Sequence, residues 1–140
     1  MRHLQQDIID TAYSYSENFK DYGNYDYSIE SLDIVDRHIQ EMGEYDLTEE
    51  MIYNICSMVG SYIFETTRRN YGGKYYWLEK EEQPVLVAGE PDYSVSIKVW
   101  QKVKDRLLNG KEDNIPFYIA GYKEHVNIGV NKKGYYVTIE

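Results

Sequence analysis

Three charged residues at helical spacing, Glu65, Arg68 and Arg69, are the strongest candidates for chemistry in this sequence. Side chains three and four positions apart lie on one face of a helix, so this carboxylate and the two guanidinium groups would meet. Paired arginines anchor carboxylates or phosphates through bidentate hydrogen bonds, and Trp77 would add an aromatic surface nearby. A plain surface ion pair that complements the helix dipole is the simpler interpretation of the same spacing. Glu65, Arg68, Arg69 and Trp77 are therefore the ligand- or partner-binding candidates.

No other group of residues matches a catalytic or metal-binding motif. His3, His38 and His125 are too scattered to form a metal site with short ligand spacing. Cys56 lies on the apolar face of a predicted helix, where a free cysteine usually behaves as a small buried hydrophobe. The glycine pair Gly72-Gly73 follows a helix, whereas a phosphate-binding loop precedes one. We expect no catalytic residues, no metal and no cofactor, and a non-enzymatic role is favoured over an enzymatic one.

The composition indicates a soluble domain that binds protein more readily than nucleic acid. The chain has 140 residues with 42% hydrophobic content, which suits one domain spanning residues 1–140. Its net charge of -9 argues against a nucleic-acid partner and favours a basic protein. No apolar run is long enough to span a membrane, and the only cysteine excludes an internal disulfide. We therefore expect a cytoplasmic protein.

The sequence is rich in tyrosine, with 16 residues of this type. Tyrosine offers a large contact area at low side-chain entropy, so it is enriched in binding surfaces. It is also common in strands and at the boundary of small cores. The cluster between Tyr13 and Tyr27 fits either interpretation equally, and a homodimer formed through tyrosines is a further alternative.

Apolar periodicity predicts most of the helices that must position these residues. The pattern indicates helices that end near Gly23, Gly43, Gly72 and Gly110, and a short helix over residues 113–123. Glycine is common at the end of a helix because it tolerates the left-handed backbone found at many C-caps.

The helix that ends at Gly72 carries the clearest signals. Asp46 followed by Glu49 fits a capping box at its start. Gly60 lies in its interior, where glycine costs about 1 kcal/mol relative to alanine, and close approach of another element would explain it. Gly72 is expected to adopt a positive φ at its end.

Two hairpins are predicted from apolar runs joined by short polar turns. The first joins Lys74–Leu78 to Pro84–Ala88, and the second joins Val126–Val130 to Tyr135–Ile139. We therefore expect an α+β fold with four or five helices packed on a small, mainly antiparallel sheet of two hairpins.

The sequence also resembles a family of small, uncharacterised bacterial proteins. The resemblance rests on the run Arg68-Arg69-Asn70-Tyr71-Gly72-Gly73 with Trp77 after it, on the helix entry at residues 27–32 and on the strand at 84–87. It covers residues 25–120 or so, and some relatives resemble immunity proteins of polymorphic-toxin systems. The resemblance implies a binding role and supplies no catalytic residues.

These observations lead to two functional hypotheses from different classes. The first is a cytoplasmic domain that binds another protein, in the specific form of an immunity protein that neutralises a toxin. The alternative is a small-molecule enzyme or anionic-ligand-binding domain that uses Glu65, Arg68, Arg69 and Trp77. We expect neither nucleic acid nor a membrane among its partners.

Overall fold

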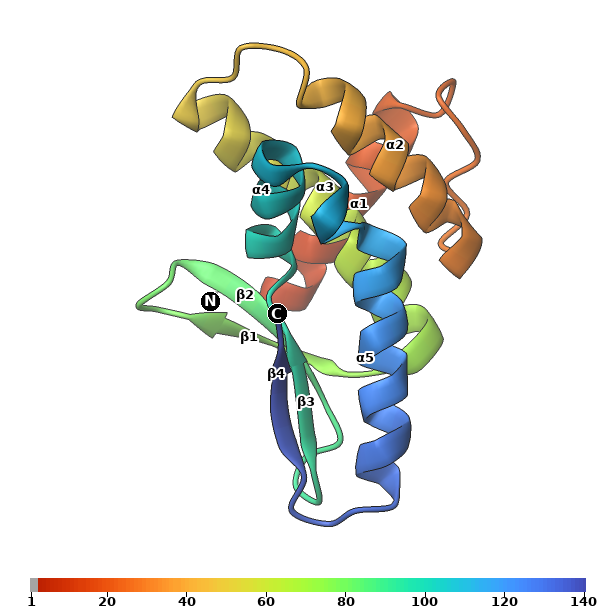
Figure 1. The fold of residues 1–140 in the computed structure, drawn as a ribbon, viewed down its shortest axis with the longest axis vertical. Coiled ribbons are helices and arrows are strands. Elements are labelled where there is room, and N and C mark those ends of the chain that lie inside the picture. The colour runs from red at the N-terminus through yellow and green to blue at the C-terminus, as the bar shows by residue number, and fades with distance from the viewer. Residues whose placement is uncertain (1–2) are drawn as a thin grey trace.

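A computed structural model describes residues 3–140 and confirms the predicted α+β fold (Figure 1). Five α-helices pack on a four-stranded sheet. The helices are α1 (Leu4–Asn18), α2 (Leu32–Met42), α3 (Glu49–Tyr71), α4 (Val99–Asn109) and α5 (Ile115–Val130). The strands are β1 (Lys74–Leu78), β2 (Gln83–Ala88), β3 (Ser94–Ile97) and β4 (Tyr136–Ile139). Short 3-10 helices, Ile29–Ser31 and Lys111–Asp113, precede α2 and α5.

Two helix starts are fixed by side chains that accept hydrogen bonds from free backbone N–H groups, one at Ser28 and one at Thr48. Ser28 accepts from the N–H of Ser31, and the first turn it caps is a 3-10 turn that leads into α2. At α3 the predicted cap was wrong. Thr48 caps this helix by accepting from the N–H of Met51, so α3 begins two residues later than a cap at Asp46 would require.

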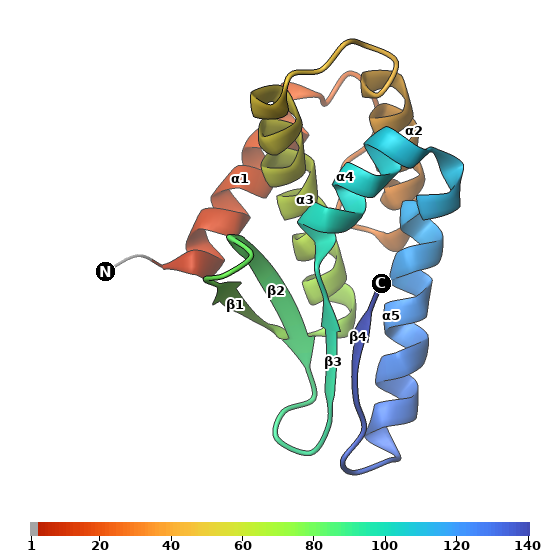
Figure 2. The same cartoon turned by 60° about the vertical axis from the view of Figure 1, so that its left-hand side comes forward.

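The sheet has the order β1-β2-β3-β4 and is mixed but mostly antiparallel. Strands β1 and β2 form the predicted hairpin, and β3 continues the antiparallel pairing on the other side of β2. Strand β4 then lies parallel to β3, with Val95 opposite Val137. The segment between β3 and β4 contains α4 and α5, and α5 packs against both strands (Figure 2).

The second predicted hairpin, over residues 126–139, was wrong. Residues 126–130 form the last turns of α5, and β4 pairs with β3, a strand that was not predicted from the sequence. The run from Val126 to Val130 is rich in β-branched residues, which favour strands, but tertiary packing overrides this weak preference. Gly129 lies directly against the ring of Tyr93, which explains why a glycine is accommodated in this helix.

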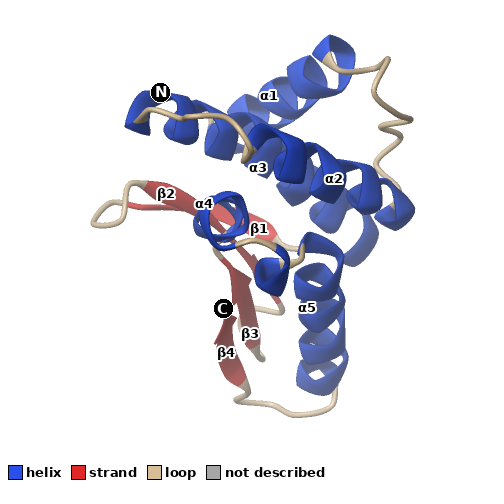
Figure 3. Cartoon of the chain, turned by 45° about the horizontal axis from the view of Figure 1, so that its top comes forward, coloured by secondary structure: helices blue, strands red, loops and turns tan. Residues whose placement is uncertain are grey.

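Gly60 permits the close contact that its position in α3 suggested. A Cβ atom added at Gly60 would lie 2.5 Å from Cδ1 of Trp100 on α4. The absence of a side chain therefore lets the indole of Trp100 lie directly on α3. In Figure 3, α4 is seen almost end-on between α3 and the strands.

The helices and the sheet share one hydrophobic core, and a buried ion pair crosses it. Large side chains from four helices and two strands are fully buried in this core: Tyr15, Leu32, Ile39, Tyr62, Ile63, Phe64, Leu86, Ile97, Ile119 and Tyr122. Arg106 on α4 is 2% exposed and donates from Nε and Nη2 to the two carboxylate oxygens of Asp36 on α2, at 3.0 and 3.1 Å. Asp36 also accepts from the backbone N–H of Ile115 at 2.9 Å. This carboxylate therefore joins α2, α4 and the start of α5.

Gly72 adopts the positive φ predicted for it, with φ 81° and ψ 179°. Its N–H donates to the carbonyl oxygen of Arg68 at 2.8 Å, which ends α3. A Cβ atom at Gly72 would meet no neighbour within 4 Å, so any effect of adding one reports backbone strain alone. We expect Gly72→Ala to lower the free energy of unfolding by about 1 kcal/mol or more. Chemical denaturation measures this, and an unchanged midpoint would contradict the assignment.

Candidate functional site

Three of the four predicted site residues meet at the corner between α3 and β1. The carboxylate of Glu65 is fully buried and accepts from Arg68 through Nε at 2.7 Å and Nη2 at 2.9 Å. Arg69 donates from Nε to Glu65 at 3.1 Å. The hydroxyl of Tyr75, on β1, donates to the same carboxylate at 2.7 Å. The corner is thus an ion-pair cluster that ties α3 to the sheet.

The electrostatics of this cluster favour a permanently charged carboxylate. Burial alone would raise the pKa of Glu65, but the hydrogen bonds from Arg68, Tyr75 and Arg69 outweigh it and hold that pKa below its ordinary value. The pKa of Arg68 is raised, chiefly by its hydrogen bonds to Glu65. Burial raises the pKa of Tyr75 as well, and the neighbouring carboxylate adds to the effect. All three groups keep fixed protonation states at neutral pH, so none of the three gains or loses a proton there.

Arg69 is further engaged by the connector that precedes α2. Its guanidinium lies 3.8 Å from the ring centroid of Tyr27, a cation–π contact. Asn70 donates from Nδ2 to the carbonyl oxygen of Tyr27 at 2.9 Å. Neither Tyr27 nor Tyr75 was predicted from the sequence to lie at the corner. An aromatic residue just after the glycine turn was the only local signal for Tyr75.

Trp77 contacts α4, whereas the other three candidates contact one another and Tyr75. Its ring makes an edge contact with Trp100 on α4, with centroids 6.1 Å apart. Tyr53, near the start of α3, makes a second edge contact with Trp100 at 5.7 Å. The predicted four-residue site is therefore divided between an ion-pair corner and an aromatic surface nearer the start of α3.

This aromatic surface borders a groove of about 580 Å³ between α3, α4 and the β1–β2 turn. We call it the α3–α4 groove. Its apolar lining consists of Ile52, Tyr53, Cys56, Trp100 and Leu108. Tyr53 is 55% exposed and Leu108 is 58% exposed, so the groove presents large apolar side chains to solvent. An exposed apolar surface of this kind, bordered by polar residues, is typical of an interaction site.

The rim of the α3–α4 groove is mainly acidic. Glu49, Glu81 and Glu82 line it, and Lys104 is its only basic lining residue within residues 3–140. Glu81 is paired with Lys98, whose Nζ lies 3.0 Å from Oε1.

Two polar atoms beside the groove lack hydrogen-bond partners in the part of the chain that the structure describes. One is Oε1 of Gln83, a buried residue at the start of β2, and the other is Nε1 of Trp100. The indole nitrogen of Trp100 faces α3, because it would lie 3.1 Å from a Cβ atom at Gly60. Only Gln83 therefore belongs to the groove as an unpaired acceptor.

Cys56 lines the groove as a buried thiol, as the sequence predicted. Burial raises its pKa to about 11. A thiol with this pKa is protonated at neutral pH and is a weak nucleophile, since the thiolate is the reactive form.

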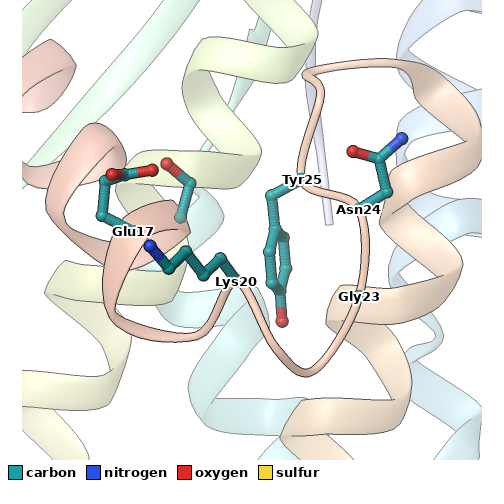
Figure 4. A pocket seen from close by; sticks show the side chains of 6 residues that line it. Glu17, Lys20, Gly23, Asn24 and Tyr25 are labelled. Atoms are coloured by element: carbon teal, nitrogen blue, oxygen red, sulfur yellow. The ribbon is translucent and has the colours of Figure 1, made fainter.

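A smaller hollow of about 340 Å³ lies beside the connector after α1 (Figure 4). Glu17 and Lys20 lie together on one side of it, and Asn24 points away from them. The ring of Tyr25 separates the two sides, and its hydroxyl lies 3.3 Å from the hydroxyl of Tyr15. The hollow is shallow and polar, and its aromatic side chain already has an internal partner.

The tyrosines between positions 13 and 27 serve mainly the core. The hydroxyl of Tyr15 lies 2.7 Å from Nδ1 of His38, and the ring of Tyr25 makes an edge contact with that of Tyr62, with centroids 5.4 Å apart. Tyr13, in contrast, is exposed to solvent. Of the two interpretations of this cluster, the geometry of its inner members supports the structural one.

His38 makes the stability of this aromatic cluster sensitive to pH. Burial lowers the pKa of His38 below 6.5, against a weaker raising effect of Glu41, and the rings of Tyr15 and Tyr22 lie against it. The folded state therefore binds a proton less readily than the unfolded state, so stability falls as the pH drops below about 6.5. We expect the free energy of unfolding to decrease by up to about 1.4 kcal/mol per pH unit in this window. Chemical denaturation of the wild type and of His38→Gln from about pH 7.5 to about pH 5 measures how much of this loss is due to His38. Parallel stability profiles of the two proteins would contradict the prediction.

Metal and membrane sites gain no support from the geometry. Within residues 3–140, no three His, Cys, Asp or Glu side chains come together in a way that could hold a metal ion. No helix in the same range is both long and apolar enough to cross a membrane.

The fold and the groove define a class, an α+β domain with an open, acid-rimmed aromatic groove and a closed ion-pair corner. Comparison with known proteins adds no particular identity to this class. No family model, no curated protein and no solved structure matches the chain. The resemblance based on the run from Arg68 to Gly73 stays a prediction.

Proposed function

We propose that this chain is a protein-binding domain that uses the α3–α4 groove as its binding surface. The observation that supports this most is that exposed Tyr53 and Leu108 line one groove, while exposed Trp77 packs against Trp100 of its lining. Large aromatic side chains supply most of the binding energy in protein interfaces, and a groove lets a partner bury them on several sides.

The corner supports the small-molecule alternative less well. Arg68 directs two of its donors, and Arg69 one, at a carboxylate of the same chain. An anionic ligand would have to displace Glu65, which is fully buried. The resemblance to immunity proteins and the net charge of -9 favour a basic toxin as the partner and the cytoplasm as the compartment.

Co-expression with the products of neighbouring genes, followed by affinity purification, tests the proposal. Tyr53→Ala should weaken binding of a co-purified partner at least about tenfold, because it removes an exposed aromatic anchor. Tyr136→Ala is the matched control, since Tyr136 is 67% exposed on β4. Equal binding by both variants would overturn the groove as the binding surface. Protection of cells that express the partner would identify it as a toxin.

A further inference from the structure

We infer that the α3–α4 groove takes a basic peptide segment of its partner, with a Lys or Arg side chain beside an apolar residue. This inference rests on the proposed protein-binding function and specifies the chemistry of the segment. It follows from the charge of the rim, the aromatic lining and one unpaired acceptor in the wall.

The charge of the rim selects for a cation. Glu49 and Glu82 are exposed, and neither forms an ion pair in the described structure. Because Glu81 is already paired with Lys98, these two carboxylates supply most of the free negative charge. They are opposed only by Lys104 among the lining residues of the described chain. An acidic segment or a nucleic-acid phosphate would meet like charge here, whereas a basic segment would meet its complement.

The lining suits the stem of a long basic side chain. Tyr53 and Trp100 contact each other edge to face, so the groove presents ring surfaces at different angles. Lysine and arginine bury their aliphatic stems on apolar surface and keep the charged end near acidic groups or over aromatic rings. Ile52 and Leu108 extend the apolar lining to the side and leave room for a neighbouring apolar residue.

Gln83 offers a hydrogen-bond acceptor to the same basic segment. Gln83 is 8% exposed, and its Oε1 accepts no hydrogen bond within residues 3–140. Its amide nitrogen donates to Oε1 of Glu81 at 3.4 Å, which is a long hydrogen bond. A donor N–H of the segment would satisfy the oxygen once the Gln83 side chain turns toward the groove, and both basic side chains offer several such donors.

Tryptophan fluorescence gives a local readout of binding. The chain has two tryptophans, and both Trp77 and Trp100 belong to this surface. The probe is a blocked heptapeptide, Gly-Lys-Leu-Arg-Lys-Leu-Gly. The control peptide has the same sequence with Glu in place of each Lys and Arg. We expect the basic peptide to change the tryptophan emission saturably at low salt, with binding that weakens as salt is added. The acidic peptide should cause no saturable change.

Variants of the rim make the assignment specific. The double variant Glu49→Gln with Glu82→Gln should weaken binding of the basic peptide about fivefold or more, because two complementary charges are lost. Glu17→Gln with Glu124→Gln removes the same charge from exposed positions elsewhere and should leave affinity within about twofold.

Three results would overturn the inference: no saturable response to the basic peptide, equal responses to both peptides, or equal weakening by both pairs of substitutions. Its failure is separable from failure of the proposed function. If a partner requires Tyr53 but is indifferent to Glu49 and Glu82, the groove binds protein through another chemistry.

Discussion

Arg106→Met is expected to lower the free energy of unfolding by about 3–5 kcal/mol, the largest effect of a single substitution proposed for this protein. The substitution keeps most of the side-chain length but leaves the carboxylate of Asp36 without its bidentate partner. Arg106 also donates from Nη1 to Gln40 at 2.8 Å, and that hydrogen bond would be lost as well. Removing one member of a buried pair is costly because the other charge stays buried and uncompensated.

Chemical denaturation of Arg106→Met measures this effect, with Arg37→Met as the matched control. Arg37 is exposed on α2, so its replacement should change stability by no more than about 0.5 kcal/mol. The double variant Asp36→Leu with Arg106→Met should be less destabilised than Arg106→Met alone, because it leaves no buried charge. Similar stability of Arg106→Met and Arg37→Met would show that the pair contributes little.

Glu65→Gln is expected to destabilise the protein by about 1.5–3 kcal/mol, the range for hydrogen bonds to charged groups. The neutral amide has nearly the same shape but offers one oxygen in place of two, so Arg68 and Tyr75 can no longer both be satisfied as they are. Arg69→Gln should cost about 1 kcal/mol or less, since the Arg69 side chain is 40% exposed and solvent screens its ion pair. This asymmetry distinguishes a buried structural cluster from an exposed ion pair.

The pH dependence of Glu65→Gln gives an independent check. Because the folded state holds the pKa of Glu65 below its ordinary value of 4.5, this group stabilises the protein above that pH. Its contribution is lost as the pH falls through the lowered pKa. The stability difference between the wild type and Glu65→Gln should therefore be constant near neutral pH and shrink in acid. A difference that is independent of pH would contradict the ionised assignment.

Local features of the fold were predictable because their causes lie within a few residues. Glu65, Arg68 and Arg69 meet because helical geometry brings positions three and four apart together. Gly72 ends α3 because its conformation suits glycine. The β1–β2 hairpin was predictable for the same reason, since two apolar runs flank a short polar turn.

Features that depend on distant partners were not predictable. Strand β3 is a run of four residues, and pairing with β2 and β4 on either side holds it in the sheet. Asp36 and Arg106 are 70 positions apart, so no local pattern marks them as a pair. Trp77 meets Trp100 of a distant helix, and the groove itself exists only where α3, α4 and the β1–β2 turn come together.

The parallel pairing of β3 with β4 constrains the order in which the molecule can fold. Ser94 lies opposite Tyr136, so the strands can meet only after a chain segment of about 40 residues has closed into a loop, at an entropic cost of roughly 3 kcal/mol. The segment becomes compact once α4 and α5 have formed, and this lowers the cost of closure. Strands β1, β2 and β3 can pair without closing a long loop, because short turns join them. The sheet should therefore grow from the β1–β2 hairpin outward, with β4 the last strand to join and its backbone amides the first in the sheet to exchange hydrogen with solvent.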